Sequence, residues 1–121
     1  MVLIIAEAGV NHNGCIDTAK KLIDVACEAG ANIIKFQTFK SEDLTTEHAP
    51  LAEYQETNSP ELINQQTLLQ KLQLNLEQHK ELKSYAINQN IEFLSTAFTL
   101  ESVDLLSEIG LERWKIPSGE I

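Results

Sequence analysis

The 121-residue sequence is poor in cysteine and in basic residues, and each shortage excludes something. Its two cysteines, Cys15 and Cys27, have neither the spacing of a zinc site nor that of a bridge within one helix. We therefore expect free thiols in a reducing compartment such as the cytoplasm. Lysine and arginine number only 9 against 18 acidic residues. The net charge of −9 argues against nucleic acid as a partner, and an anionic ligand would need a local cluster of donors.

Long hydrophobic runs and nucleotide-binding loops are also missing. The apolar opening "VLIIA" stops at Glu7 and has no basic segment before it, so it predicts neither a secretion signal nor a membrane span. Neither the Walker phosphate loop nor G-x-G-x-x-G is present, which disfavours a nucleotide site. What is present is 43% hydrophobic and 22% charged residues, the composition of one globular domain.

Strand-like and helix-like segments alternate along the chain. Apolar, β-branched runs predict strands over residues 2–6, 31–39, 91–98 and 113–121. Helical spacing predicts helices over residues 15–30, 59–74, 76–89 and 100–109, and residues 40–60 form a polar segment without a clear period. Asn75 followed by Gln78 predicts a capping box, and Thr99 predicts a second helix cap. The alternation predicts an α/β fold with a parallel sheet.

Two architectures fit four such βα units. One is a small open α/β sheet. The other is the N-terminal half of a TIM (β/α)8 barrel, whose complete form typically needs about 250 residues. Both architectures bind their ligands at the carboxyl ends of the strands.

Polar side chains interrupt the apolar strands near those carboxyl ends. They are Glu7 on the first strand, Lys35 and Gln37 on the second, Ser95 and Thr96 on the third, and Lys115, Ser118 and Glu120 on the fourth. A lone lysine can extend to solvent from a barrel wall, and Glu7 with Lys35 can form a structural ion pair. Because buried charges are costly unless paired, two lysines and two glutamates at one edge favour a polar site. Ammonium groups with hydroxyl and amide donors suit a phosphate or a phosphate-plus-carboxylate ligand, beside which glutamates can relay protons.

The motif "NHNG" at residues 11–14 has two interpretations. Asn-Gly is a common turn dipeptide, which predicts a loop. His12 would lie at the same edge as the polar side chains, within reach of a substrate, but one histidine is weak evidence for a metal site. His48 and His79 fall in the polar segment and on a helix, and we expect both to be solvated.

The motifs IIAEAGVNHNG, IIKFQTFK, AEYQ, EFLSTAF, LESVDLL and KIPSGEI follow one another along essentially the whole chain. In this order they resemble the sialic acid synthase family, which includes N-acetylneuraminate synthases and relatives that make legionaminic or pseudaminic acid. The resemblance implies a TIM barrel followed by a small antifreeze-like domain. On that basis residues 1–121 are a partial catalytic barrel, truncated after the fourth strand and without the C-terminal half-barrel or the antifreeze-like domain.

The resemblance also implies an activity. Members of the family condense phosphoenolpyruvate with an N-acylated hexosamine such as N-acetylmannosamine, giving a nine-carbon 2-keto sugar acid and phosphate. A divalent metal, Mn²⁺ or Mg²⁺, serves the full-length enzyme, and the metal-binding histidines lie beyond position 121. We expect the full-length protein to be a cytoplasmic homodimer and the 121 residues alone to be inactive.

The functional residues of the family match positions of this sequence. Its phosphoenolpyruvate-binding residues match Lys35, Gln37, Thr96, Lys115 and Ser118. Glu120 and Glu7 match its catalytic glutamates, and Phe98 matches a wall of the sugar site, with His12 as a further candidate there. Ala97 replaces the proline of the family's T-P-F motif, which relaxes that turn.

Two other functions stay open. A half-barrel exposes two strand edges and an apolar face, so it can serve as a non-catalytic module that binds anions or self-associates. A different phosphoenolpyruvate-condensing sugar-acid synthase of the same barrel type is the other alternative.

Overall fold

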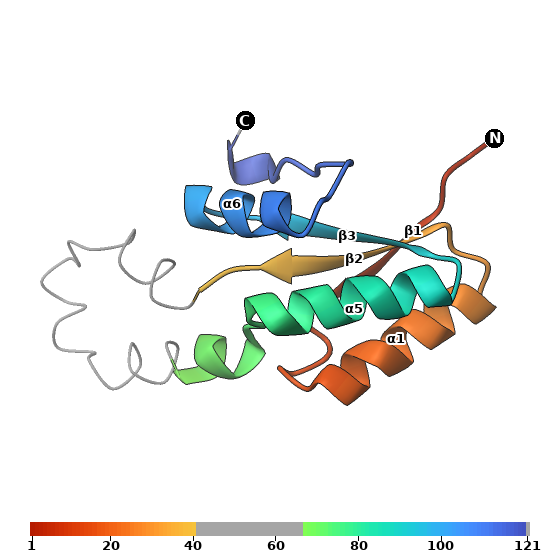
Figure 1. Cartoon of the computed structure of the whole chain (residues 1–121), viewed down its shortest axis with the longest axis horizontal. Coiled ribbons are helices and arrows are strands. Elements are labelled where there is room, and N and C mark those ends of the chain that lie inside the picture. The colour runs from red at the N-terminus through yellow and green to blue at the C-terminus, as the bar shows by residue number, and fades with distance from the viewer. Residues whose placement is uncertain (41–66, 121) are drawn as a thin grey trace, which may run out of the picture.

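The computed structural model of the chain describes residues 1–40 and 67–120 (Figure 1). Its sheet has three parallel strands in the order β1 (Ile5–Gly9), β2 (Ile33–Thr38) and β3 (Glu92–Ala97). Three helices accompany the strands: α1 (Ile16–Glu28) between β1 and β2, α5 (Leu76–Asn88) before β3, and α6 (Leu100–Glu108) after it. The predicted α/β fold with a parallel sheet is confirmed.

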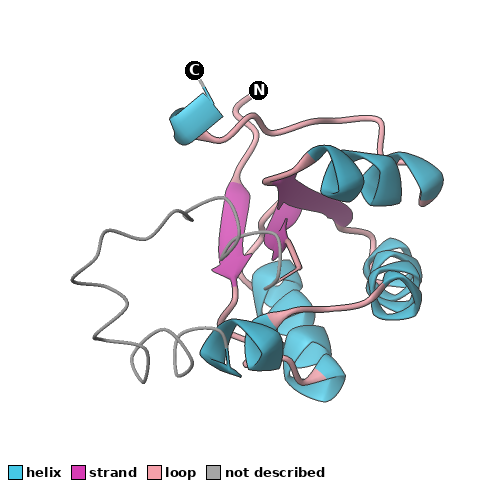
Figure 2. Cartoon of the chain, turned by 90° about the vertical axis from the view of Figure 1, so that its left-hand side faces the viewer, coloured by secondary structure: helices cyan, strands magenta, loops and turns pink. Residues whose placement is uncertain are grey.

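Helices α1, α5 and α6 gather on one side of the sheet, as the view along the layers shows (Figure 2). Their apolar side chains meet those of alternate strand residues in one core. On the strands this core includes Ala8, Ile34, Phe36, Phe93 and Ala97. The rings of Phe36 and Phe93 stack with their centroids 5.4 Å apart, which joins β2 to β3 beneath the helices.

Local sequence signals explain where two helices begin. The Asn75 side chain accepts a bond of 2.8 Å from the backbone N–H of Gln78, whose own side chain accepts one of 2.9 Å from the Asn75 N–H. This is the predicted capping box, and it satisfies donors that a helix start leaves unpaired. Thr99 caps α6 in the same sense, by accepting a bond of 3.2 Å from the N–H of Ser102.

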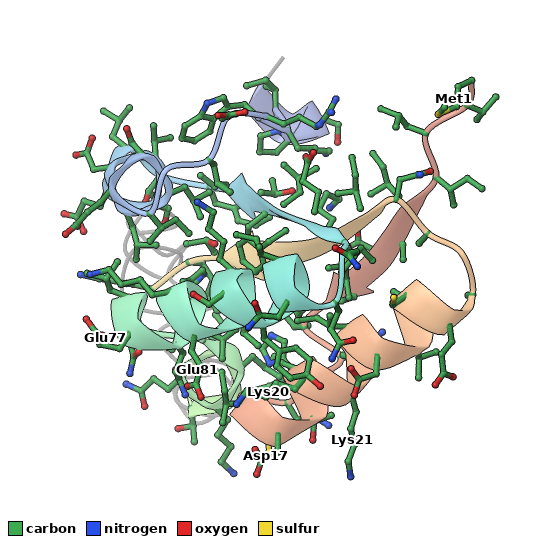
Figure 3. The ribbon with its side chains drawn as sticks, turned by 45° about the vertical axis from the view of Figure 1, so that its right-hand side comes forward. Met1, Asp17, Lys20, Lys21, Glu77 and Glu81 are labelled. Carbon is green, nitrogen blue, oxygen red and sulfur yellow. The ribbon has the colours of Figure 1, made fainter. Side chains whose placement is uncertain are left out.

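The outer surfaces of α1 and α5 are polar and lie side by side (Figure 3). Lys20 of α1 points toward Glu81 of α5, with 2.8 Å between Nζ and Oε1. The Tyr85 hydroxyl donates to the Asp24 carboxylate at 2.7 Å. These contacts join α1 and α5 on the surface that faces away from the sheet.

The first predicted strand was placed too early. Residues 2–6 were expected to be buried on both faces, whereas β1 covers Ile5–Gly9 and Val2 to Ile5 have exposed fractions between 46% and 82%. The reason is pairing: Ile33 is the first residue of β2 and pairs with Ile5, so β1 is an edge of the described sheet and Val2 to Ile4 precede its ladder.

The fourth predicted strand, residues 113–121, is reduced to one bridge. Lys115 pairs with Thr96 in parallel, and Ser118–Glu120 then form a 3-10 turn. Pro117 lacks a backbone N–H, so it cannot extend a ladder from Lys115. The predicted helix over 59–74 and the predicted solvation of His48 fall wholly or partly outside the described residues; within them, residues 67–72 are helical.

Both cysteines are free, as expected: Cys15 is exposed and Cys27 is half-buried. Within residues 1–40 and 67–120, no helix has the length and apolar character needed to cross a membrane.

Candidate functional site

The face of the sheet opposite the helices carries four residues of the predicted site. Neighbouring residues of a strand point to opposite faces, and directly paired residues of parallel strands point to the same face. Lys35 pairs with Glu7 on one side, and Gln37 pairs with Thr96 on the other. These four side chains therefore share the face that the described helices leave uncovered.

Lys35 is the centre of this group. Its Nζ lies 2.7 Å from Oε2 of Glu7 and donates to Oγ1 of Thr96 at 3.2 Å. The lysine side chain is only 14% exposed, whereas the glutamate side chain is 51% exposed. The register partner of Lys35 on β3 is the buried Leu94, so the lysine stem runs over apolar surface while the ammonium reaches polar partners. An ammonium has three donors, and the described residues occupy two of them.

Gly9 shapes the space beside Glu7. The register of β1 shifts between Glu7 and Gly9, and Gly9 has a φ of +55°. A Cβ at Gly9 would lie 3.1 Å from Oε1 of Glu7 and 3.8 Å from Nε2 of Gln37. The glycine thus leaves room beside both the glutamate carboxylate and the glutamine amide, at the carboxyl ends of β1 and β2.

The C-terminal residues continue the same edge. Because Lys115 pairs with Thr96, it occupies the next position across the sheet from the Lys35 group, and its side chain is exposed. Ser118 is also exposed and begins the 3-10 turn that follows. Of Glu120 the structure describes only the backbone, in this turn. Phe98 lines an apolar groove of about 280 Å³ together with Ile116 and others.

Two predicted polar residues, Ser95 and His12, lie on the other face or in the core. Ser95 is fully buried on the helix side of β3, not beside Lys35. His12 lies at the carboxyl end of β1, but it is 0% exposed and its ring centroid is 5.9 Å from that of Phe36. It does not join the Lys35 group.

The motif "NHNG" forms a turn, and the backbone conformation of this turn explains its residue types. Nδ1 of His12 accepts a bond of 2.8 Å from the N–H of Gly14, while its Nε2 has no partner among the described residues. Asn13 and Gly14 both have positive φ, of 54° and 75°, which asparagine and glycine adopt most readily. The predicted turn is confirmed, and burial followed by the nearby His79 lowers the pKa of His12.

The expectation that His79 is solvated was wrong. Its side chain is 0% exposed; Nε2 lies 2.8 Å from the hydroxyl of Thr38, and Nδ1 lies 2.7 Å from the carbonyl oxygen of Asn75. Burial lowers its pKa. Helical spacing offered a usable signal, because His79, Leu82 and Ala86 fall on one stripe and all three are buried.

A second hollow, a cleft of about 460 Å³, lies on the helix side between the end of β2, the start of α5, and α6. Among the described residues its charged lining is mostly acidic, with Glu101, Asp104 and Glu108 against Lys40. Nζ of Lys40 lies 3.9 Å from Oε2 of Glu101, so the charge of this lysine is balanced by a carboxylate. An anion is better served by the Lys35 face.

Metal ligation finds no support in the part of the chain that is described. Within residues 1–40 and 67–120, no three histidine, cysteine, aspartate or glutamate side chains are grouped so as to hold an ion. What the described edge offers is an ammonium in a fixed position, hydroxyl and amide groups beside it, a second exposed lysine and one carboxylate. Such a set can bind an anion and handle a proton next to it.

Comparison with known proteins gives consistent matches. The chain is 54% identical over 119 residues to the N,N'-diacetyllegionaminic acid synthase of Campylobacter jejuni, covering 98% of this chain and 36% of that protein. It is 49% identical over 118 residues to the synthase of the same name from Legionella pneumophila, covering 98% of this chain and 33% of that one. The chain therefore spans about a third of the length of these relatives.

Solved structures agree. The crystal structure of an N-acetylneuraminic acid (sialic acid) synthetase from Leptospira borgpetersenii in complex with citrate superimposes with a TM-score of 0.76 at 35% identity. The match covers 95% of this chain and 35% of that one. A model of the NeuB family matches residues 22–121, which is most of the sequence. This chain belongs to the NeuB family.

Proposed function

We propose that this chain is the N-terminal part of a synthase that condenses phosphoenolpyruvate with an N-acylated hexosamine. The products are a nine-carbon 2-keto sugar acid and phosphate. The observation that supports this most directly is the Lys35 ammonium, held between Glu7 and Thr96 at the carboxyl ends of parallel strands, where the described residues occupy two of its three donors. The names of the legionaminic acid synthase relatives support the class of product.

In this proposal each residue has a defined task. Lys35, Gln37, Thr96, Lys115 and Ser118 bind the phosphate and carboxylate of phosphoenolpyruvate. The two lysines supply positive charge within a chain of net charge −9, and the amide and hydroxyls supply directed donors.

The glutamates and Phe98 serve the reacting carbons. Glu7 and Glu120 hold or move a proton there, and Phe98 walls the sugar. A divalent metal, Mn²⁺ or Mg²⁺, held by residues outside this chain, would polarise the sugar aldehyde.

The architecture belongs to the same proposal. We take the three strands and the bridge at Lys115 as the first part of a TIM barrel, whose remaining strands would continue the sheet from its edges. The exposed apolar residues before β1 fit such a continuation. The full-length protein would be a cytoplasmic homodimer with an antifreeze-like domain, and the 121 residues alone would not turn over substrate.

The binding part of the proposal is testable on the chain itself. Phosphoenolpyruvate is titrated into wild type, Lys35→Ala and Lys20→Ala, and the amide NMR shifts give each Kd. Lys20 is the matched control because it is also a half-buried lysine paired with a glutamate, but on the helices. A hydrogen bond to a charged group contributes about 1.5–3 kcal/mol, so Lys35→Ala should raise Kd roughly ten- to a hundredfold. Equal Kd values for the three proteins would refute the assignment.

A second candidate function has one observation in its favour. Val2, Leu3 and Ile4 are exposed just before β1, and Ile5 is exposed at its start, at an edge of the described sheet. Unpaired edges with apolar side chains promote association between chains, which suits a self-assembling, non-catalytic module. Sedimentation equilibrium from micromolar to millimolar concentration distinguishes the two: a monomer throughout removes this candidate.

A further inference from the structure

A chain of hydrogen bonds runs through the core directly behind the candidate site. The hydroxyl groups of Ser95 on β3 and Thr38 on β2 are 2.6 Å apart, and the Thr38 hydroxyl is 2.8 Å from Nε2 of His79 on α5. The other ring nitrogen, Nδ1, is 2.7 Å from the carbonyl oxygen of Asn75. The three side chains are at most 2% exposed, so water has little access to them.

Donor and acceptor roles in this chain follow from its last member. A carbonyl oxygen can only accept, so Nδ1 of His79 carries a proton and donates it to Asn75. Burial lowers the pKa of His79, which favours the neutral ring, and Nε2 is then an acceptor. The Thr38 hydroxyl donates to Nε2, and the Ser95 hydroxyl donates to Thr38. Every proton of the chain has one acceptor, so the arrangement is fully satisfied.

The hydrogen-bonded residues Ser95, Thr38 and His79 are anchored at the start of α5. Asn75 is the capping residue of that helix, and its carbonyl also accepts the backbone N–H of His79 at 3.0 Å. Its side chain forms the capping box with Gln78. The first turn of α5 is therefore held by several hydrogen bonds, and the bonds of His79, Thr38 and Ser95 connect this turn to β2 and β3.

The members of the chain alternate with the members of the site. Thr38 follows Gln37 on β2, and Ser95 precedes Thr96 on β3. Since neighbouring strand residues point to opposite faces, each buried hydroxyl lies on the reverse side of a site residue. The Ser95–Thr38 bond connects β2 and β3 at the level where, on the other face, Lys35 bonds to Thr96.

We infer that Ser95, Thr38 and His79 are positioning residues, which hold the ends of β2 and β3 so that Lys35 and Thr96 keep their mutual geometry. The inference rests on the proposed function for its ligand, but the geometric part stands without it. Ligand-binding groups have to be held within a fraction of an ångström by the groups behind them. A hydroxyl pair anchored through an imidazole to a capped helix supplies such a constraint.

The decisive comparison is Thr38→Val against Thr38→Ser. Valine has nearly the shape of threonine but removes the hydroxyl, which breaks the bonds of Thr38 to Ser95 and to His79; serine keeps the hydroxyl. The readout is the ¹⁵Nζ NMR signal of Lys35, which depends on its bonds to Glu7 and Thr96. We expect Thr38→Val to shift this signal and Thr38→Ser to leave it near the wild-type position. The Nζ signal of Lys20, bonded to Glu81 on the far side of the core, is the internal reference and should not move.

A core variant separates positioning from general stability. Ile23→Val removes one methyl group from the fully buried face of α1 and no member of the chain. It should lower Tm without shifting the Lys35 signal. If it shifts the signal as Thr38→Val does, or if Thr38→Val lowers Tm and leaves the signal in place, the inference is wrong. If Thr38→Val does not fold, Ser95→Ala, which keeps the Thr38–His79 bond, decides by the same readout.

Two further measurements complete the test. In the wild type, ¹⁵N shifts of the His79 ring should show a neutral imidazole with its proton on Nδ1; a proton on Nε2 would contradict the chain as described. Phosphoenolpyruvate should bind Thr38→Val at least fivefold more weakly than Thr38→Ser. If the wild type does not bind phosphoenolpyruvate, the proposed function fails. The Lys35 signal still decides whether Ser95, Thr38 and His79 position that lysine.

Discussion

Gly14→Ala, which adds a single methyl group, should strongly lower the free energy of unfolding. Gly14 has a φ of +75°, and an added Cβ would overlap the carbonyl oxygen of Lys71 and lie 2.9 Å from its carbonyl carbon. The left-handed conformation costs a residue with a Cβ about 1–2 kcal/mol. Moving the backbone of residues 67–72 away from the turn adds roughly 1–3 kcal/mol, as other overpacking does. Gly14→Ala should thus lower the free energy of unfolding by about 2–5 kcal/mol, a large part of the 5–15 kcal/mol typical of a domain.

Gly30 provides the control, because it differs in only one respect. Its φ is +85°, but a Cβ there meets no atom within 4 Å among the described residues. Gly30→Ala should therefore show only the conformational cost, about 1–2 kcal/mol. Urea unfolding of wild type and both variants, followed by circular dichroism, gives the two differences. Equal losses would refute the argument that Gly14 is required by the close approach of Lys71.

Two further predictions concern titratable side chains. The Thr18 hydroxyl, followed by backbone N–H groups of the first turn of α1, lowers the pKa of the exposed Cys15 thiol, whereas Cys27 is half-buried and donates to a carbonyl. A thiol reagent at pH 7 should label Cys15 first, and mass spectrometry of the digested protein checks the order. Burial lowers the pKa of His12 and His79 below 6.5, so the unfolded chain binds more protons in acid. Stability should be complete above pH 6.5 and fall as the pH drops through the folded pKa values, by at most about 1.4 kcal/mol per pH unit for each histidine. Urea unfolding between pH 8 and pH 5 measures this, and a constant free energy would contradict it.

The parts of the fold that follow from local signals could be predicted from the sequence. The capping box of Asn75 and Gln78 involves residues three apart, and the structure contains both of its bonds. The start of β1 depends instead on where β2 begins, since Ile5 pairs with Ile33 across 28 positions. The apolar run before Ile5 contains no information about that partner, so the strand was placed three residues too early.

For the candidate site, strand alternation was the informative signal. It placed Lys35 and Gln37 on one face, and the register of the three strands then brought Glu7 and Thr96 to the same face. The sequence could not give the bonds of Lys35, because they depend on the register between strands that lie 61 positions apart at Thr96. The polar character of His79 suggested a solvated residue, although its helical spacing indicated burial.

Ser95 and Thr96 show why a run of polar residues in a strand cannot be assigned to a site as a whole. They are chemically alike and adjacent, yet the Ser95 hydroxyl bonds to Thr38 on the helix side of the sheet, whereas the Thr96 hydroxyl, which is also buried, accepts from Lys35 on the opposite face. Each buried hydroxyl needs a partner, so Ser95 requires Thr38, and Thr38 in turn requires an acceptor such as His79. The same period of two that collects the ligand-binding groups on one face therefore collects the groups that hold them on the other. A substitution of Ser95 should be expected to act on the site through Thr38 and the strand ends, not through contact with a ligand.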